Sequence, residues 1–347
     1  MNPRLRFGMP VASGLLLLFC TGGCSRADDD GGTVVVYSSV DDVFARPVAE
    51  RFGEETGIEV RLVPDTEETK STGLVNRLIA EQERPQADVF WSGDPVRAAL
   101  LKSRGISAPH NSPSASDLPP EYADPDGHWT GFSARARVLI YNTNLVLASE
   151  TPQSVMDLLD PRFEGRVVLA DPLFGTTSMH AAALFEALGD TEAQAFFEGF
   201  IANGGVILSS NGEVRRRVAA GDFAVGITDT DDFNVARQEG QPVGIVYPDQ
   251  GGMGTLIVPN AAVLIRGGPN PDAGKRFIDY LLSPETERAL AESEAAQIPL
   301  RPEIPVPLYV RPLSDLQPMR VDYPRLTQRL EQLSAGFLRE WVESNLR

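Results

Sequence analysis

Three carboxylates and two hydroxyls stand within five consecutive residues of this chain. They belong to Thr228, Asp229, Thr230, Asp231 and Asp232. The apolar run 223–227 before them predicts a short buried strand, and residues 233–237 after them have a helical pattern. Because ligands bind beyond the carboxyl ends of strands in open α/β sheets, this turn is a candidate binding site. The alternative is an ordinary solvated turn in which Asp229 or Thr230 caps the following helix.

The elements that would position this turn begin at residue 33. We expect strands at 33–37, 58–63 and 87–91, and helices at 43–56, 69–83 and 95–103. Gly57 is suited to end the first helix, Thr69 or Ser71 to cap the second, and Pro95 to begin the third. This alternation predicts an α/β fold with a parallel, doubly wound sheet.

The first 24 residues have the features of an export signal. Arg4 and Arg6 form a basic start, and residues 11–19 form an apolar segment too short to span a bilayer. Residues 21–24, Thr-Gly-Gly-Cys, resemble the lipobox of bacterial lipoproteins, in which the chain is cut before the cysteine and its thiol is acylated. We therefore predict a signal peptide at 1–23, lipidation of Cys24 and a tether over 24–32. A cleaved secretory signal without lipid is the alternative.

Composition limits the classes of partner. The net charge is −17, and loss of Arg4 and Arg6 with the signal would make it −19, which argues against nucleic acid. The two cysteines are Cys20, which would leave with the signal, and Cys24, so we expect neither a disulfide nor a catalytic thiol. The length predicts two lobes, and no later segment is long enough to span a membrane.

Several segments resemble the extracellular solute-binding proteins of ABC importers, above all the ferric-ion-binding branch. They are residues 34–39, 49–52, 56–60, 87–92, 133–142, 221–226, 262–265 and 275–283. The resemblance extends in order over residues 33–302. It implies the two-lobed, type II periplasmic-binding-protein fold, in which each lobe is a doubly wound, mostly parallel sheet and hinge strands lie between the lobes.

The resemblance also implies where the lobes begin and end. Lobe one would comprise 33–133, lobe two 134–257, the return to lobe one 258–302, and a C-terminal extended segment with a closing helix 303–347. We expect the chain to cross between lobes at 132–141 and 255–265. Residues 324–345 have the pattern of one amphipathic helix, docked on the body or available to a partner.

The family arrangement places several strand ends and loops at the cleft between the lobes. The ligand-binding residues that it implies are Ser39, Asp41, Asp94, Thr176, Thr177, Ser178, Asp229, Thr230 and Asp231. Asp171 and the pair Asp249–Gln250 are further candidates. Segment 175–178 matches the place where ferric-binding proteins hold an accessory anion at the start of a helix. Ordinary N-capping by these hydroxyls is the alternative.

The metal ligands of the ferric-binding branch do not transfer unchanged. Two adjacent tyrosines of that branch correspond by spacing to Thr230 and Asp231. The candidate metal ligands are instead Asp41, Asp94 and Asp231, whose carboxylate oxygens suit hard cations. Together with Asp42, Asp229 and Asp232 they would form a cluster of six carboxylates, which a bound cation or amine would stabilise. Arg135 and Arg137 on the hinge are the alternative source of positive charge.

These observations predict a lipid-anchored, extracytoplasmic and monomeric receptor that delivers a small ligand to the permease and ATPase subunits of an ABC transporter. The expected ligand is ferric iron (Fe3+) or another hard cation with an accessory anion, and we expect no cofactor. One alternative ligand is a small zwitterion such as an aminophosphonate. A secreted metal-dependent hydrolase is the alternative from another class, although no hydrolase motif is present. We expect His110, His128 and His180 to be surface or capping residues.

Overall fold

The computed structural model describes residues 32–65 and 72–346. The predicted signal peptide, the predicted lipidation site Cys24 and the expected helix caps Thr69 and Ser71 lie outside these residues. Within the described ranges, no helix combines the length and the apolar character needed to cross a membrane.

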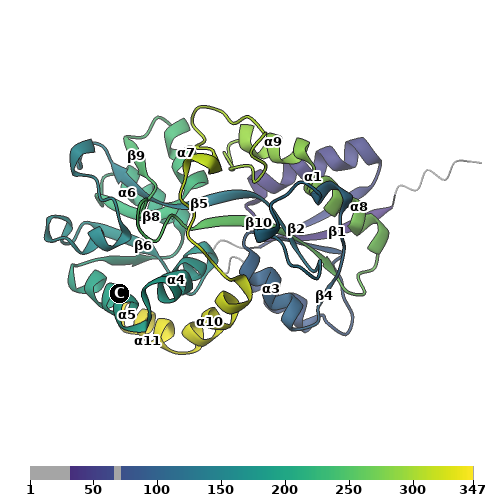
Figure 1. The fold of residues 1–347 in the computed structure, drawn as a ribbon, viewed down its shortest axis with the longest axis horizontal. Coiled ribbons are helices and arrows are strands. Elements are labelled where there is room, and N and C mark those ends of the chain that lie inside the picture. Colours follow the sequence, from purple (N-terminus) through teal and green to yellow (C-terminus); the bar gives the residue numbers. More distant parts are fainter. Residues whose placement is uncertain (1–31, 66–71, 347) are drawn as a thin grey trace, which may run out of the picture. The chain divides into compact units, whose positions relative to one another are not determined.

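Lobe one begins with a parallel α/β unit (Figure 1). Strand β1 (Thr33–Ser38) pairs in parallel with β2 (Glu59–Pro64) and with β3 (Val89–Ser92). The helices are α1 (Asp42–Thr56), α2 (Thr72–Ala80) and α3 (Pro95–Ser103). Every residue of β3 is buried, as a central strand covered on both faces requires. Gly57 ends α1 at a φ of 73°, which confirms the predicted C-cap.

Two long antiparallel strands connect lobe one to lobe two. They are β5 (Thr130–Asn142) and β10 (Ile257–Ile265). Strand β10 also pairs with β3 and β4 (Ser107–Ala108) in lobe one. The register shifts between Pro259 and Asn260, which leaves Ser133 as an extra residue of β5, with a φ of 36°. This bulge locally disrupts the pairing of β5 with β10.

Lobe two repeats the parallel arrangement. Strand β6 (Val167–Ala170) pairs in parallel with β7 (Val206–Leu208) and β8 (Val225–Asp229), whereas β9 (Val243–Val246) runs antiparallel to β5. The helices are α4 (Gly175–Leu188), α5 (Asp190–Ala202), α6 (Asn211–Ala219) and α7 (Thr230–Gln238). The described residues thus form one ten-stranded sheet, ordered β2-β1-β3-β10-β5-β8-β6-β7, with β4 and β9 at its sides.

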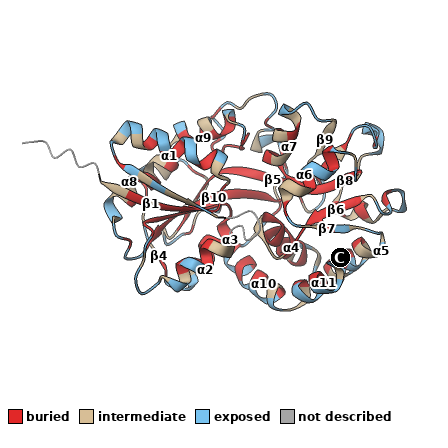
Figure 2. Cartoon of the chain, turned by 180° about the vertical axis from the view of Figure 1, so that it is seen from behind, coloured by how far each residue is buried: buried red, intermediate tan, exposed pale blue. Residues whose placement is uncertain are grey.

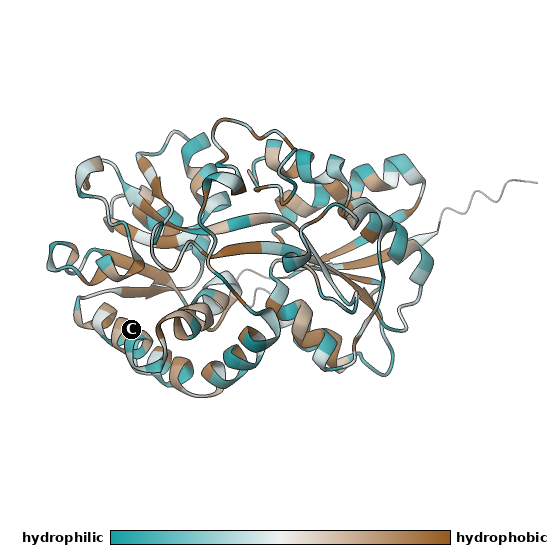
Figure 3. Cartoon of the chain, viewed as in Figure 1, coloured by the Kyte–Doolittle hydropathy of each residue, from teal (hydrophilic) through white to brown (hydrophobic). Residues whose placement is uncertain are grey.

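The core follows this sheet. Figures 2 and 3 show that the buried and the hydrophobic residues gather along the strands and the inner faces of the helices. Helices α8 (Pro271–Leu281) and α9 (Pro284–Glu292) return the chain to lobe one. There the ring of Phe277 meets that of Phe52 edge-on, with centroids 5.0 Å apart.

The C-terminal segment differs from the prediction of one helix. It forms two, α10 (Tyr323–Ala335) and α11 (Phe337–Asn345), because Gly336 has φ −123° and ψ −115°, a non-helical conformation that glycine adopts readily. Thr327 of α10 donates to the carbonyl of Val96 in α3, whereas Trp341 of α11 donates to that of Phe197 in α5. The helix pair therefore contacts both lobes.

Candidate functional site

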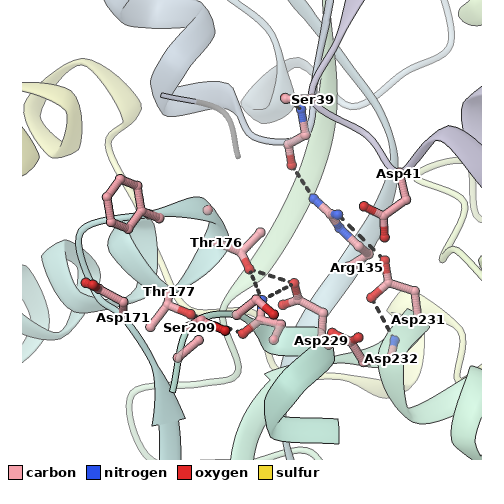
Figure 4. Close-up of a pocket in the computed structure, with 17 residues that line it drawn as sticks. Ser39, Asp41, Arg135, Asp171, Thr176, Thr177, Ser209, Asp229, Asp231 and Asp232 are labelled. Atoms are coloured by element: carbon pink, nitrogen blue, oxygen red, sulfur yellow. Dashed lines mark hydrogen bonds and ion pairs between the residues drawn. The ribbon is translucent and has the colours of Figure 1, made fainter. Parts of the chain in front are cut away.

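A small cavity lies where the two lobes face each other (Figure 4). Its walls are Ser39, Asp41 and Gly93 from lobe one, Arg135 from β5, and Ala170, Asp171, Phe174, Gly175, Thr176, Thr177, Ser209, Ser210, Asn211, Gly212, Asp229, Asp231 and Asp232 from lobe two. Its free volume of about 40 Å³ accommodates an ion with one or two waters, since a water-sized sphere takes roughly 10–15 Å³. Most wall residues lie at the ends of strands or the first turns of helices, as the sequence predicted.

Asp229 ends β8 and precedes α7, but its side chain does not cap that helix. Its carboxylate instead pairs with Nη1 of Arg137 at 2.9 Å and accepts hydrogen bonds from Thr176 at 2.6 Å and Asn211 at 3.1 Å. The alternative of Asp229 as an ordinary side-chain cap is therefore wrong. Burial opposes ionisation, but Arg137 and Arg135 outweigh it and hold the pKa of Asp229 below its ordinary value.

At Asp231, in contrast to Asp229, the effect of burial on the pKa outweighs the attraction of the neighbouring arginine. Burial raises the pKa of its carboxyl to about 8, because the attraction of Arg135 is too weak to offset it and three neighbouring carboxylates add repulsion. The nearest contact with Arg135 is 3.6 Å, between Nη1 and Oδ2. Its Oδ1 accepts a hydrogen bond from the backbone N–H of Asp232 at 3.0 Å. The two carboxyls therefore titrate far apart, with Asp229 ionised and Asp231 largely protonated at neutral pH.

Asp229, Asp231 and Asp232 form the carboxylate cluster of the cavity. Their nearest oxygens all lie within 4.8 Å of one another, close enough for one metal ion. The Oδ2 of Asp232 accepts a hydrogen bond from Thr228 at 2.7 Å. Figure 4 shows Asp41 of lobe one beside Arg135 and Asp231. Three of the four carboxylates thus come from the turn that the sequence singled out.

Two expected members of the carboxylate cluster lie elsewhere. Asp94, a predicted metal ligand, is buried and caps α3 by accepting from the N–H of Arg97 at 2.9 Å; it does not line the cavity. Asp42 forms an exposed ion pair with Arg46 one helical turn away. The prediction of six converging carboxylates is therefore wrong at these two positions, because both residues lie at helix starts where local hydrogen bonds hold their side chains.

Arg135 joins the two lobes at the cavity. Its Nη2 donates to the carbonyl of Gly93, which follows β3, and its Nη1 faces Asp231. Ser39 supports the same corner, because its Oγ accepts from the N–H of Gly93 at 2.8 Å. The sequence offered Arg135 and Arg137 as counter-charges for the carboxylates, and each arginine does pair with one aspartate of the β8–α7 turn.

Hydroxyl and amide groups form the opposite side of the cavity. Thr176 and Thr177 line it from the first turn of α4, and Oγ1 of Thr177 donates to Oδ1 of Asn211 at 3.1 Å. Ser178 faces away, since its Oγ donates to the carbonyl of Gly175 and accepts from Arg97. The backbone N–H groups in the first turns of α4 and α6 make this side suitable for an anion.

The start of α6 also belongs to the site, although it was not predicted from the sequence. Residues 209–212, Ser-Ser-Asn-Gly, line the cavity, and Ser210 caps α6 by accepting from Glu213 at 3.1 Å. The signal was present as a polar run with a capping residue, but the strand before it, β7, is too short to stand out by periodicity.

Several predicted residues lie outside the cavity. The hydroxyl of Thr230 accepts from the backbone N–H of Ala136 and so ties the turn to β5. Asp249 accepts from Ser154, and Gln250 donates to Thr255, so neither reaches the cleft.

The interpretation of His180 as a surface or capping residue is wrong: it is buried in α4, and burial lowers its pKa to about 3.

Comparison with known proteins places this site in a family. The family of bacterial extracellular solute-binding proteins matches residues 84–317. Iron uptake protein A1 of Synechocystis sp. is 28% identical over 74% of this chain and 71% of its own. A Salmonella typhi periplasmic protein named for 2-aminoethylphosphonate binding is 31% identical, over 70% of this chain and 69% of its own. Iron-bound HitA from Pseudomonas aeruginosa is 24% identical, with a TM-score of 0.80 over 89% of this chain and 99% of its own.

These similarities confirm the predicted fold class, a two-lobed α/β binding protein of type II. They also confirm the predicted role outside the cytoplasm as a non-enzymatic receptor that works with the permease and ATPase of an ABC transporter. The chain belongs to the bacterial extracellular solute-binding proteins.

Proposed function

We propose that the receptor captures ferric iron or another hard cation, accompanied by a small anion, in the cavity between its lobes. The observation that carries this proposal is the carboxylate cluster of Asp229, Asp231 and Asp232, with oxygens within 4.8 Å of one another. Carboxylate oxygens are hard ligands, and hard cations prefer them. The curated relatives named for iron support the same ligand class.

The charge of the cavity supports a cationic ligand. Of the described residues, five aspartates and one arginine line it, and Arg137 is paired with Asp229. Burial and the neighbouring carboxylates raise the pKa of Asp231 to about 8, so its carboxyl is largely protonated at neutral pH. A cation in contact with Asp231 would displace that proton and supply the missing charge.

An accessory anion would occupy the opposite side. Arg137 donates to Thr176, Thr177 and Asn211 there and brings positive charge to this side. Helices α4 and α6 begin at the same place, and helix N-termini favour negative charge. Asp231 and Asp232 would then hold the cation next to Asp229, with Asp41 facing them from lobe one.

The lobes would close on the ligand by rotation about β5 and β10. We place the lobe boundaries at 33–133 and 134–257, with 258–302 returning to lobe one. The bulge at Ser133 and the register shift at Pro259 support bending at this point, because bulges locally disrupt the ladder. We further propose that the mature chain is a monomer anchored to the membrane through lipid on Cys24.

Native mass spectrometry with elemental analysis tests the ligand. Protein purified without chelator is expected to retain iron, or another hard metal, at close to one equivalent. Metal-free protein that also fails to bind ferric citrate in calorimetry would refute the cation proposal.

A small zwitterion is the second candidate. The cavity places carboxylates on one side and hydroxyls, amides and helix N-termini on the other, an arrangement that also suits an amine and a phosphonate. The absence of the tyrosine pair and the relative named for 2-aminoethylphosphonate favour this alternative over a neutral solute. Calorimetric titration with 2-aminoethylphosphonate separates the two candidates, because a ferric receptor should not bind it.

A further inference from the structure

A second, apolar cavity lies beside the ligand cleft. It occupies about 270 Å³ between α2, α3, α10 and the loop that leads into α4; Figure 2 shows α2, α3 and α10 next to one another. Its apolar wall includes Val75, Val96, Leu100, Leu173, Phe174 and Leu330. Apolar side chains make up most of its inner surface, in contrast to the polar cleft.

Arg97 is a buried charged residue among those that line this cavity. Its side chain is buried, with the residue only 6% exposed. Its Nη2 donates to Ser178 at 2.9 Å and lies 3.5 Å from the hydroxyl of Thr72. Among the residues that the structure describes, its Nη1 has no hydrogen-bond partner. A buried, charged donor without a partner is costly, so the cavity lacks a group that would complete Arg97.

The charges around the cavity indicate that the group missing beside Arg97 is an anion. Arg339 lies at the exposed rim, whereas the carboxylate of Glu331 is already paired with Arg104 at 2.7 Å. A carboxylate matches the planar guanidinium of Arg97 better than a neutral acceptor does. The apolar side chains of Val75, Leu100 and Phe174 would at the same time cover a hydrocarbon tail.

We propose that this cavity binds a small amphipathic carboxylate, with its carboxylate on Arg97 and its short aliphatic or aromatic tail against the apolar wall. The proposal concerns a ligand distinct from the one in the cleft. The volume is large enough for a ligand such as hexanoate or benzoate.

Binding at this cavity should be coupled to the cleft. Val75 and Leu100 belong to lobe one, whereas Leu173 and Phe174 belong to lobe two, and Phe174 also lines the ligand cleft. A ligand that contacts both walls favours the arrangement of the two lobes in which these walls are close together. By thermodynamic reciprocity, the ligand in the apolar cavity strengthens binding of the cleft ligand by a certain factor. The cleft ligand strengthens binding in the apolar cavity by the same factor.

The test is a calorimetric titration of the protein with hexanoate, with hexanol and hexylamine as probes of equal length. We expect hexanoate to bind and the other two to bind at least tenfold more weakly. Arg97→Met should weaken hexanoate by about 10- to 100-fold, as expected for the loss of a charge-assisted contact. Arg46→Met, which removes an exposed arginine of α1, is the matched control and should leave the affinity unchanged.

A second variant keeps the test decisive if Arg97→Met fails to fold. Leu100→Trp fills the cavity from another wall and should abolish hexanoate binding while the circular-dichroism spectrum stays that of the folded wild type. Equal affinities for hexanoate and hexanol, or binding that survives Leu100→Trp, would overturn the proposal. So would a loss of hexanoate binding in Asp231→Asn, because that result would place hexanoate in the cleft. None of these outcomes depends on the identity of the cleft ligand.

Discussion

Arg135 and Asp231 face each other across the junction of the two lobes, with Nη1 and Oδ2 3.6 Å apart. The gap is wider than a hydrogen bond, whereas the neighbouring pair of Arg137 and Asp229 is closed at 2.9 Å. The two pairs therefore have different roles in the cavity. Arg137 and Asp229 form a complete structural pair, and Asp231 keeps carboxyl oxygens available for a ligand.

Asp231→Asn is predicted to weaken binding of a cationic ligand by roughly 10- to 100-fold, because it removes one charged contact. The change is nearly isosteric, and the side chain is largely protonated at neutral pH, so folding should be retained. Calorimetry with ferric citrate measures the effect, with Glu285→Gln on the exposed face of α9 as the control. Affinity equal to the wild type, together with a lowered thermal midpoint, would mean that Asp231 has only a structural role.

Asp229→Asn is predicted to act on stability. It leaves the fully buried guanidinium of Arg137 without its ion-pair partner, which typically costs about 3–5 kcal/mol. The control is Asp222→Asn, which breaks an exposed pair with Arg217 and should cost at most ~1 kcal/mol. Denaturant unfolding followed by circular dichroism measures both variants. Similar midpoints for the two would contradict the assignment of Asp229 as a structural partner.

The contribution of Asp231 to the stability of the ligand-free protein is predicted to fall as the pH rises from about 4 to 8. The folded pKa of Asp231, about 8, lies above the ordinary value near 3.9, so the folded state holds a proton that the unfolded state has released. Asp231→Asn removes this term, and its stability relative to the wild type should therefore increase with pH. The thermal midpoints of the variant and the wild type, measured at pH 5 and pH 8, show whether this relative stability rises or falls with pH. A variant that loses stability relative to the wild type between pH 5 and pH 8 would be incompatible with a raised pKa of Asp231.

Cys24→Ser is predicted to release the protein from membranes or to block processing of its precursor. The basis is the basic start, the short apolar segment and the small residues before Cys24. Membrane fractionation of cells that express each form measures the effect, and Cys20→Ser is the control. Normal processing and unchanged membrane association of the Cys24→Ser variant would refute lipidation at this residue.

The sequence predicted much of the fold because the repeated strand–helix order has a strong periodic signal. Residues 33–37, 95–103 and 132–141 correspond closely to β1, α3 and β5. Tertiary effects explain the errors. Gly336 divides a helix that is amphipathic throughout, and the orientation of Asp94 follows from a local hydrogen bond with Arg97 that spacing alone does not reveal.

The site was partly predictable for the same reason. The turn at 228–232 and the segment around Thr176 stand at strand ends, and the structure brings them together. Residues 209–212 escaped notice because β7 is so short. The pairing of Arg137 with Asp229 rather than with Asp231 depends on the exact placement of β5 and β8, which no linear pattern encodes.

Crystals of the protein soaked with ferric citrate test the central claim most directly, through the anomalous signal of iron in the cleft. The account predicts one iron peak within bonding distance of the Asp231 and Asp232 carboxylates, with density for an anion beside Thr176 and Thr177. An empty cleft under these conditions, with 2-aminoethylphosphonate bound instead in a parallel soak, would contradict the assignment of a metal ion as the ligand.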